Sequence, residues 1–334
     1  MLLRNELRVT SKATGANTVP STIGAVLVSL FLSLAATKVH AAEPWLDPGS
    51  QSTTWEWLLE RRQQVSRQVT QLGRNLDEWL AGEGVGEQLN ETYLSVRFNQ
   101  LYGKFDHYNS KIKIGGRLDL PTVSERWKLI FESDVQEFNT LQENILDEPN
   151  SGDSIGGIRY QDETDSGWNL SHDLGIRSVV PIDPFYRFRA RQTFPVSDLW
   201  SVGLDQRFWY YDSRGWGFDT EVSFTRELGV DRFVRITSKA NFQDERDATQ
   251  FSQTAAIFRT LGPDETLGYE LGLLGINKPS IRVNDYYVQM LYRRAVYEDW
   301  LFLEVTPQVL VSRDENWRPQ PRLLVNLEML FFDF

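Results

Sequence analysis

Ser171, His172 and Asp173 are adjacent and have the side-chain types of a hydrolytic relay. In such a relay a serine oxygen attacks a carbonyl carbon, a histidine accepts the serine proton, and a carboxylate orients the histidine. The three side chains must therefore converge in space. Side chains alternate between the two faces of an extended strand, so Ser171 and Asp173 would point away from His172. We predict that this triplet is not a catalytic site, and we predict no other catalytic residue.

A second set of candidate residues is acidic. Glu143, Asp147, Glu148 and Asp153 lie within residues 141–154 and carry the oxygen ligands that Ca²⁺ and Mg²⁺ prefer, but their spacing does not match an EF-hand loop. The chain has no cysteine, which excludes thiolate metal sites, disulfides and cysteine catalysis. We interpret residues 141–154 as a solvated external loop, and we predict neither a metal site nor a cofactor.

Charged side chains also recur at every second position over much of the chain. In residues 184–195, Arg187, Arg189 and Arg191 alternate with Tyr186 and Phe188. The same alternation elsewhere predicts a ladder of charges that share one face of a sheet. This charge ladder comprises Arg187, Arg189, Arg191, Asp205, Arg207, Asp219, Glu221, Glu227, Glu270, Arg293, Glu304 and Glu328.

The elements that position these residues are predicted to be β-strands from Thr92 onward. Most of the predicted strands have 10 to 14 residues, whereas strands of globular proteins average about 5–6. A tilted crossing of a membrane needs about 9–11 residues. The fourteen predicted strands are 92–105, 109–120, 125–138, 155–162, 167–180, 184–195, 199–212, 215–228, 232–243, 250–261, 265–276, 284–297, 299–312 and 319–332.

Three features favour a membrane barrel over a soluble sandwich. The strands are long, and the chain stops on an alternating strand, 319–332, followed by Asp333 and Phe334. Aromatic residues also stand near strand ends, where lipid headgroups would contact them. Because lipid cannot pair with backbone groups, the sheet must close. The tryptophans that we assign to this girdle are Trp127, Trp168, Trp200, Trp209, Trp216 and Trp300.

The fold class is therefore all-β: an antiparallel transmembrane β-barrel of about 14 strands preceded by one amphipathic periplasmic helix. Twelve strands are the alternative, if 155–162 and 167–180 belong to one excursion. The charged faces would then point into the lumen. Two interpretations stay open, namely a ladder that braces a nearly filled lumen and a polar pore that orients small ions or zwitterions.

The N-terminus has the features of an export signal. Ile23–Ala36 is an uncharged apolar stretch, too short to span a bilayer, and basic residues precede it. Residues 39–41 fit a small-residue cleavage site, and an uncleaved anchor is the alternative. We predict a signal peptide at 1–41, a periplasmic linker and helix at 42–88, and a barrel at 89–334.

The periplasmic helix is expected over residues 53–81. Its apolar residues follow heptad spacing. Docking on the rest of the chain, self-association and contact with a membrane surface are the three interpretations of this stripe. The stripe consists of Leu58, Val65, Val69, Leu72, Leu76 and Trp79, with Arg62 in one of its positions.

The pattern resembles Gram-negative outer-membrane β-barrel proteins, whose last strand alternates and ends in an aromatic residue. Here Leu323, Val325, Leu327, Met329 and Phe331 match that strand, while Phe334 falls on the opposite face. A helix before a mid-sized barrel is also similar to a group of proteobacterial envelope proteins. The resemblance implies outer-membrane lipids, lipopolysaccharide and the barrel-insertion machinery as partners.

The function that we predict from these features is a non-enzymatic barrel, either a passive channel or an envelope-organising protein. A lipid-modifying enzyme and a transporter of a small or hydrophobic ligand are the alternatives. The formal net charge of −11 provides no attraction for nucleic acid.

Overall fold

The computed structural model describes residues 51–81, 92–103, 107–120, 126–133, 135–146 and 153–332. The predicted signal peptide, most of the predicted linker, Asp147, Glu148 and the terminal Phe334 lie outside these residues.

Long strands make up most of the described chain, and their bounds follow the predicted ranges closely except at β3. The strands are β1 (Tyr93–Gly103), β2 (His107–Asp119), β3 (Trp127–Glu132), β4 (Ile155–Glu163), β5 (Asn169–Arg177), β6 (Asp183–Pro195), β7 (Trp200–Tyr211), β8 (Gly215–Gly229), β9 (Arg232–Gln243), β10 (Ala248–Gly262), β11 (Glu265–Ile276), β12 (Arg282–Tyr297), β13 (Leu301–Ser312) and β14 (Pro319–Phe331).

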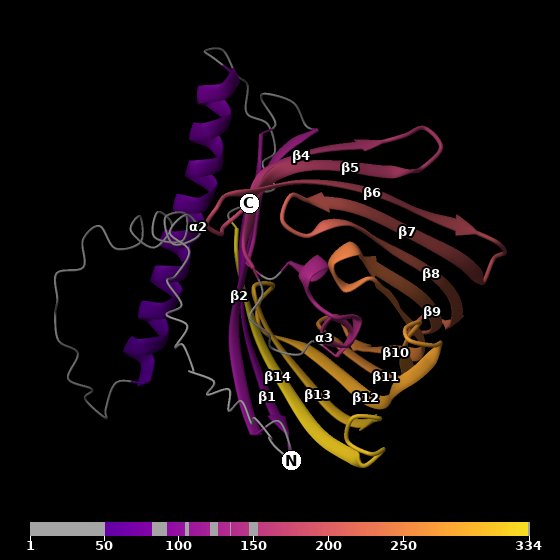
Figure 1. Ribbon diagram of the computed structural model, residues 1–334. Coiled ribbons are helices and arrows are strands. Elements are labelled where there is room, and N and C mark those ends of the chain that lie inside the picture. The colour runs from indigo at the N-terminus through magenta and orange to yellow at the C-terminus, as the bar shows by residue number, and fades with distance from the viewer. Residues whose placement is uncertain are drawn as a thin grey trace, which may run out of the picture.

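The strands close into a barrel in which every neighbouring pair is antiparallel (Figure 1). Consecutive strands pair, and β1 closes the ring against β14 from Leu94–Phe331 to Gly103–Arg322. β4 and β5 are separate strands, paired along their full length. The fold prediction of a 14-stranded antiparallel barrel is therefore confirmed, and the 12-strand alternative is wrong.

The outer surface is apolar, as a membrane-spanning wall requires. Leu323, Val325 and Leu327 of β14 point outward, while the intervening Leu324 and Asn326 are buried on the inner face. The register also settles β10, whose alternation is weak in the sequence. Ser252, a buried residue, lies opposite the buried Leu274 of β11, so the even-numbered residues of β10 face inward. The chain has the architecture of Gram-negative outer-membrane β-barrel proteins.

Two of the tryptophans that we assigned to the headgroup girdle lie elsewhere. Trp209 faces inward and is buried with Phe185 and Tyr211, because its position on β7 has the parity of the inner face. Trp300 is fully buried in the turn between β12 and β13. Trp127 and Trp200 are exposed at the first residues of β3 and β7, and Trp216 is exposed at the second residue of β8, as the girdle requires.

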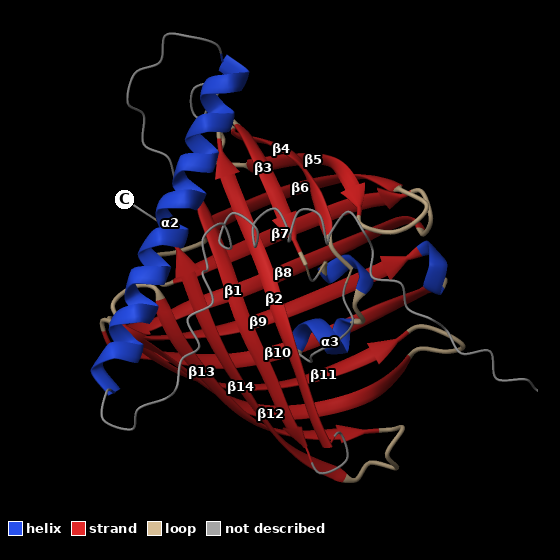
Figure 2. Cartoon of the chain, turned by 90° about the vertical axis from the view of Figure 1, so that its left-hand side faces the viewer, coloured by secondary structure: helices blue, strands red, loops and turns tan. Residues whose placement is uncertain are grey.

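One long helix, α2 (Gln51–Ala81), lies outside the barrel against the wall formed by β14, β1 and β2 (Figure 2). Val69 is buried in this contact, and the Arg62 guanidinium lies 5.0 Å from the Trp300 ring centroid and 5.3 Å from that of Phe332. The helix thus docks on the barrel. Within the described residues, no helix is long and apolar enough to cross a membrane.

The prediction of a strand over residues 125–138 is wrong beyond Glu132, and the prediction of an external loop is wrong for the described residues 141–146. β3 ends at Glu132, and the chain then turns into the barrel as a 3₁₀ turn, η1 (Gln136–Phe138), and a short helix, α3 (Leu141–Ile145). Figure 1 shows α3 within the ring of strands. We call residues 135–146 the inward segment.

Candidate functional site

The inward segment forms its own local structure. The Thr140 hydroxyl accepts a hydrogen bond from the Glu143 amide at 3.1 Å, and the Glu143 carboxylate accepts one from the Thr140 amide at 2.6 Å. This reciprocal pair is a capping box, which satisfies two amides at a helix N-terminus. Glu143, a candidate cation ligand in the sequence, therefore caps α3. Asp153, another candidate, pairs with Arg177 at 3.1 Å and Arg214 at 3.4 Å. The described residues contain no cluster of three or more metal-ligating side chains.

Apolar and polar contacts fix the inward segment to the wall made by β10 to β13. Leu141 and Leu146 are buried against Leu274, Tyr287 and Leu310. The burial of these side chains gives the inward segment a hydrophobic anchor inside the barrel.

Hydrogen bonds to the same wall add to this anchor. The Gln250 side chain accepts a bond from the Leu141 amide at 3.0 Å, and the Gln308 amide group donates to the Leu146 carbonyl at 3.2 Å. Arg246 donates to the Asn139 carbonyl at 2.8 Å. Burial lowers the pKa of the Arg246 guanidinium, and the nearby Glu143 carboxylate opposes this shift.

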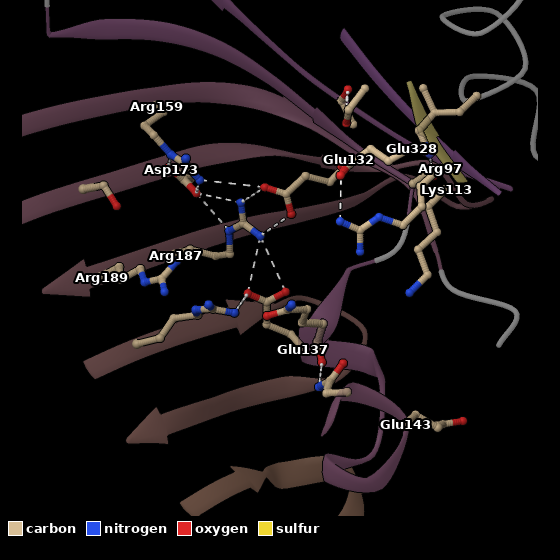
Figure 3. Close-up of a pocket in the computed structure, with 18 residues that line it drawn as sticks. Arg97, Lys113, Glu132, Glu137, Glu143, Arg159, Asp173, Arg187, Arg189 and Glu328 are labelled. Carbon is tan, nitrogen blue, oxygen red and sulfur yellow. Dashed lines mark hydrogen bonds and ion pairs between the residues drawn. The ribbon is translucent and has the colours of Figure 1, made fainter. Parts of the chain in front are cut away.

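Ion pairs fix the other side of the segment. Glu137, which is 2% exposed, lies 3.4 Å from Arg187 and 3.1 Å from Arg207. Arg187 also contacts Glu132 at 2.9 Å and Asp173 at 2.7 Å, so it stands between three carboxylates (Figure 3). Such charge-assisted bonds are among the strongest in proteins, and buried charges require them.

Other members of the predicted charge ladder pair on the adjoining strands. Arg189 binds Asp205 through two nitrogens, and Arg191 lies 3.5 Å from the same carboxylate. Lys239, which the ladder omits, lies 3.1 Å from Asp219 and 3.8 Å from Glu221. Glu227 shares their inward parity and is exposed near the end of β8.

The ladder continues on the opposite wall. Arg293 lies 3.5 Å from Glu304 and 2.8 Å from Glu328, and Glu328 also pairs with Arg97 at 3.2 Å. Glu270 accepts hydrogen bonds from the Tyr287 hydroxyl at 2.7 Å and from the Gln289 side chain. The structure thus brings the ladder residues other than Glu227 and Glu270 together in local ionic groups along the inner wall.

A cavity of about 390 Å³ lies inside the barrel beside the inward segment. Its lining includes six cationic and five acidic side chains, so neither sign dominates. Two cationic pairs, Arg97 with Lys113 and Arg189 with Arg207, stand directly opposite each other on neighbouring strands. The charged lining residues are Arg97, Lys113, Arg159, Arg187, Arg189, Arg207, Glu132, Glu137, Glu143, Asp173 and Glu328.

The triplet Ser171-His172-Asp173 is split between two faces. Asp173 pairs with Arg159 at 2.7 Å inside the barrel, and Ser171 lines the cavity. His172 points outward, and its Nδ1 lies 2.8 Å from the Tyr186 hydroxyl. A relay among these three residues is therefore geometrically impossible.

Several residues of the cavity were not in the predicted ladder. Glu132 and Arg159 face inward from β3 and β4, and their alternation with Phe131 and Ile158 carries the same period-two signal. Lys113 and Arg97 carry it on β2 and β1. Glu137 follows the end of β3, and no strand periodicity could place it inside the barrel.

No protein-family model matches the chain, and no curated protein matches it. Among solved structures, it is similar to the KdgM porin at 12% identity and a TM-score of 0.37, over 70% of this chain and 98% of that one. The NanC porin aligns at 8% identity and a TM-score of 0.36, over 72% and 100% of the two chains. OmpT of Vibrio cholerae, an outer-membrane protein, aligns at 9% and 0.45, over 74% and 100%. At these sequence identities and TM-scores, the alignments do not show that the chain shares an activity with any of these proteins.

Proposed function

We propose that this protein is a passive channel of the outer membrane, reached after signal-peptide export, through which small ions and zwitterions pass. One observation carries the proposal: the barrel encloses a charged cavity, and an inward segment narrows the lumen beside it. Rings and walls of charged side chains select ions in pores.

The paired charges of the inner wall support zwitterions as the solute class. Arg191 lies 3.5 Å from Asp205 on one side, and Arg293 lies 2.8 Å from Glu328 on the other. A solute that carries both signs can contact a charge of opposite sign with each of its charged groups along such a wall.

The test is the conductance of the purified, refolded protein in planar bilayers, in potassium chloride. Stepwise conductance is expected, and bilayers that stay silent with folded protein would refute the proposal. Arg191→Glu should shift the reversal potential toward cation selectivity, because this side chain faces the lumen and is 55% exposed. Arg226→Glu is the matched control. Arg226 faces outward over the Trp200 ring, so its charge should not affect selectivity.

A further inference from the structure

Four polar side chains lie together on the outward face of β7 to β10, among outward neighbours that are mostly apolar. Their orientation follows from the register, because each stands next to an inward-facing charged or buried residue of its own strand. All four lie near the middle of their strands, and therefore at the depth of the hydrocarbon. We call Gln206, Thr220, Ser238 and Gln253 the polar patch.

Hydrogen bonds join the polar patch in two pairs across neighbouring strands. The Thr220 hydroxyl donates to the Gln206 side-chain oxygen at 2.7 Å, and the Gln206 amide group donates to the Arg207 carbonyl at 3.3 Å. The Ser238 hydroxyl donates to the Gln253 side-chain oxygen at 2.6 Å. Among the described residues, none accepts a hydrogen bond from the Gln253 amide group. The exposed Gln253 side chain thus presents two N–H donors to the surroundings of the barrel.

Lipid cannot satisfy these donors at this depth. Acyl chains contain no hydrogen-bond acceptor, so a polar group that faces them stays unpaired at a cost in free energy. Headgroups can bond outward polar residues near the ends of strands. Gln100 is such a residue, since it faces outward three residues before the end of β1 and accepts a hydrogen bond from Tyr102. The mid-strand polar patch instead fits a protein surface.

The surface around the polar patch allows another wall to approach closely. Ala240 lies directly opposite Thr220, and Ala255 follows Gln253 on the outward face of β10. Their small side chains lie between larger outward residues, such as Phe218 on β8. Small and polar residues at the point of contact are typical of surfaces that pack together in membranes.

This face is not covered by the docked helix. α2 contacts β14, β1 and β2, whereas β8 lies halfway around the ring from β1 (Figure 1). A glutamine amide group is both donor and acceptor, so the polar patch can pair with an identical patch across a two-fold axis. A second copy of the chain is therefore a partner with matching chemistry.

We propose that this protein forms a two-fold symmetric dimer in the membrane, in which β7 to β10 of the two copies pack together. The Gln253 amide group of each copy then donates to the polar patch of the other. This interface is distinct from the heptad stripe of α2, in which Val69 is buried against the barrel of its own chain. The inference does not depend on the channel activity proposed above.

The dimer can be tested by sedimentation equilibrium of the full-length, refolded protein in density-matched detergent micelles. The parent protein should have the mass of two chains. Gln253→Leu should weaken association roughly tenfold, because each dimer loses two symmetry-related amide contacts. Gln100→Leu is the matched control, since it removes an outward glutamine outside the polar patch, and it should leave association unchanged. A folded parent protein that sediments as a monomer would overturn the proposal.

Two further measurements separate loss of contact from loss of folding. Gln253→Leu removes an unpaired amide from the lipid-facing wall, so its barrel should unfold at the parent temperature or above. Ala240→Trp fills the centre of the polar patch and should prevent dimers, whereas Val305→Trp, at an outward mid-strand position on β13, should not. Dimers that persist in both patch variants would refute this interface, and their loss on truncation of residues 51–82 would place the contact on α2.

Discussion

Among single residues, Glu137 should contribute most to the stability of the ion pairs inside the barrel. It is the acidic partner that the inward segment offers to Arg187 and Arg207. We expect Glu137→Gln to leave these guanidiniums without that charge and to lower the free energy of unfolding by about 3 kcal/mol. Unfolding in denaturant, in lipid vesicles, measures the change. Glu227→Gln is the control, since Glu227 is exposed, and an equal loss there would show that position in the lumen does not matter.

The two faces of the wall should respond differently to substitution. Val325→Arg places a charge on the outward face of β14 and should cost about 2–4 kcal/mol if the position is near mid-bilayer. Glu221→Ala, on an inward position of β8, should cost less, because Lys239 keeps its shorter contact with Asp219. The stability of the two refolded variants is compared by the temperature at which the barrel unfolds and its mobility on a gel changes. A Val325→Arg barrel as stable as the parent would mean that this face does not meet lipid.

At the residue scale, period-two alternation is enough to assign side chains to faces. It places Arg187 inward and His172 outward, as the register has them. It does not show which inward residues are buried. Trp209 has inward parity, yet its position near a strand end suggested a girdle. Trp209 is buried in a cluster that includes Phe185 of β6, Ile155 of β4 and Val135 of the inward segment, and the sequence of β7 alone does not encode these contacts.

The inward segment is the element that controls the width of the lumen. Replacing residues 135–146 with a short glycine-serine link should leave the barrel able to insert, because no ladder of the barrel includes these residues. Single-channel conductance should then rise severalfold, since the segment would no longer occupy the lumen. A conductance equal to that of the parent protein would show that another part of the chain sets the bore.

The docked helix α2 adds stability from outside the wall. Truncation of residues 51–82 should permit insertion, because all strands of the ring remain, but should lower the temperature of heat-dependent mobility change. Arg62→Ala should cause part of the same loss, because Arg62 lies over the rings of Trp300 and Phe332. Failure of the truncated chain to insert would make the helix an essential part of the barrel.

At the element scale, strands were predictable because most of them repeat one simple period over nine or more residues. β3 was the exception. Residues 125–138 read as one strand, but β3 ends at Glu132, and Val135 then packs against Ile155 and Phe185 inside the barrel. Such long-range packing competes with local strand propensity, and only the folded barrel decides the outcome.

For the whole molecule, an even strand number brings both ends of the ring to one side, where β14 pairs with β1. The wall is unequal around this ring, because its ladders are longest near β7 to β12 and shortest between β2 and β3, where five residue pairs are formed. The inward segment follows β3, one of the two strands that form this short ladder. The closure of the barrel wall and the narrowing of the lumen are thus linked. The residues that enter the lumen follow directly after β3 and take no part in the wall.

Ring closure can be tested covalently, because the chain has no cysteine of its own. Val96 of β1 lies opposite Met329 of β14, although 233 positions separate them in the sequence (329 − 96 = 233). Directly opposed residues in antiparallel strands have Cα atoms about 4.5–5.5 Å apart, within the range that a disulfide spans. The double variant Val96→Cys/Met329→Cys should therefore form an intramolecular disulfide on oxidation, seen as faster migration of the denatured chain.

The control is Val96→Cys/Val309→Cys, in which the second cysteine lies on β13. This strand does not adjoin β1, so no such shift in migration is expected. If the first pair stayed reduced while the barrel was folded, the sheet would be open at β1 and β14, and a sealed transmembrane wall would be excluded.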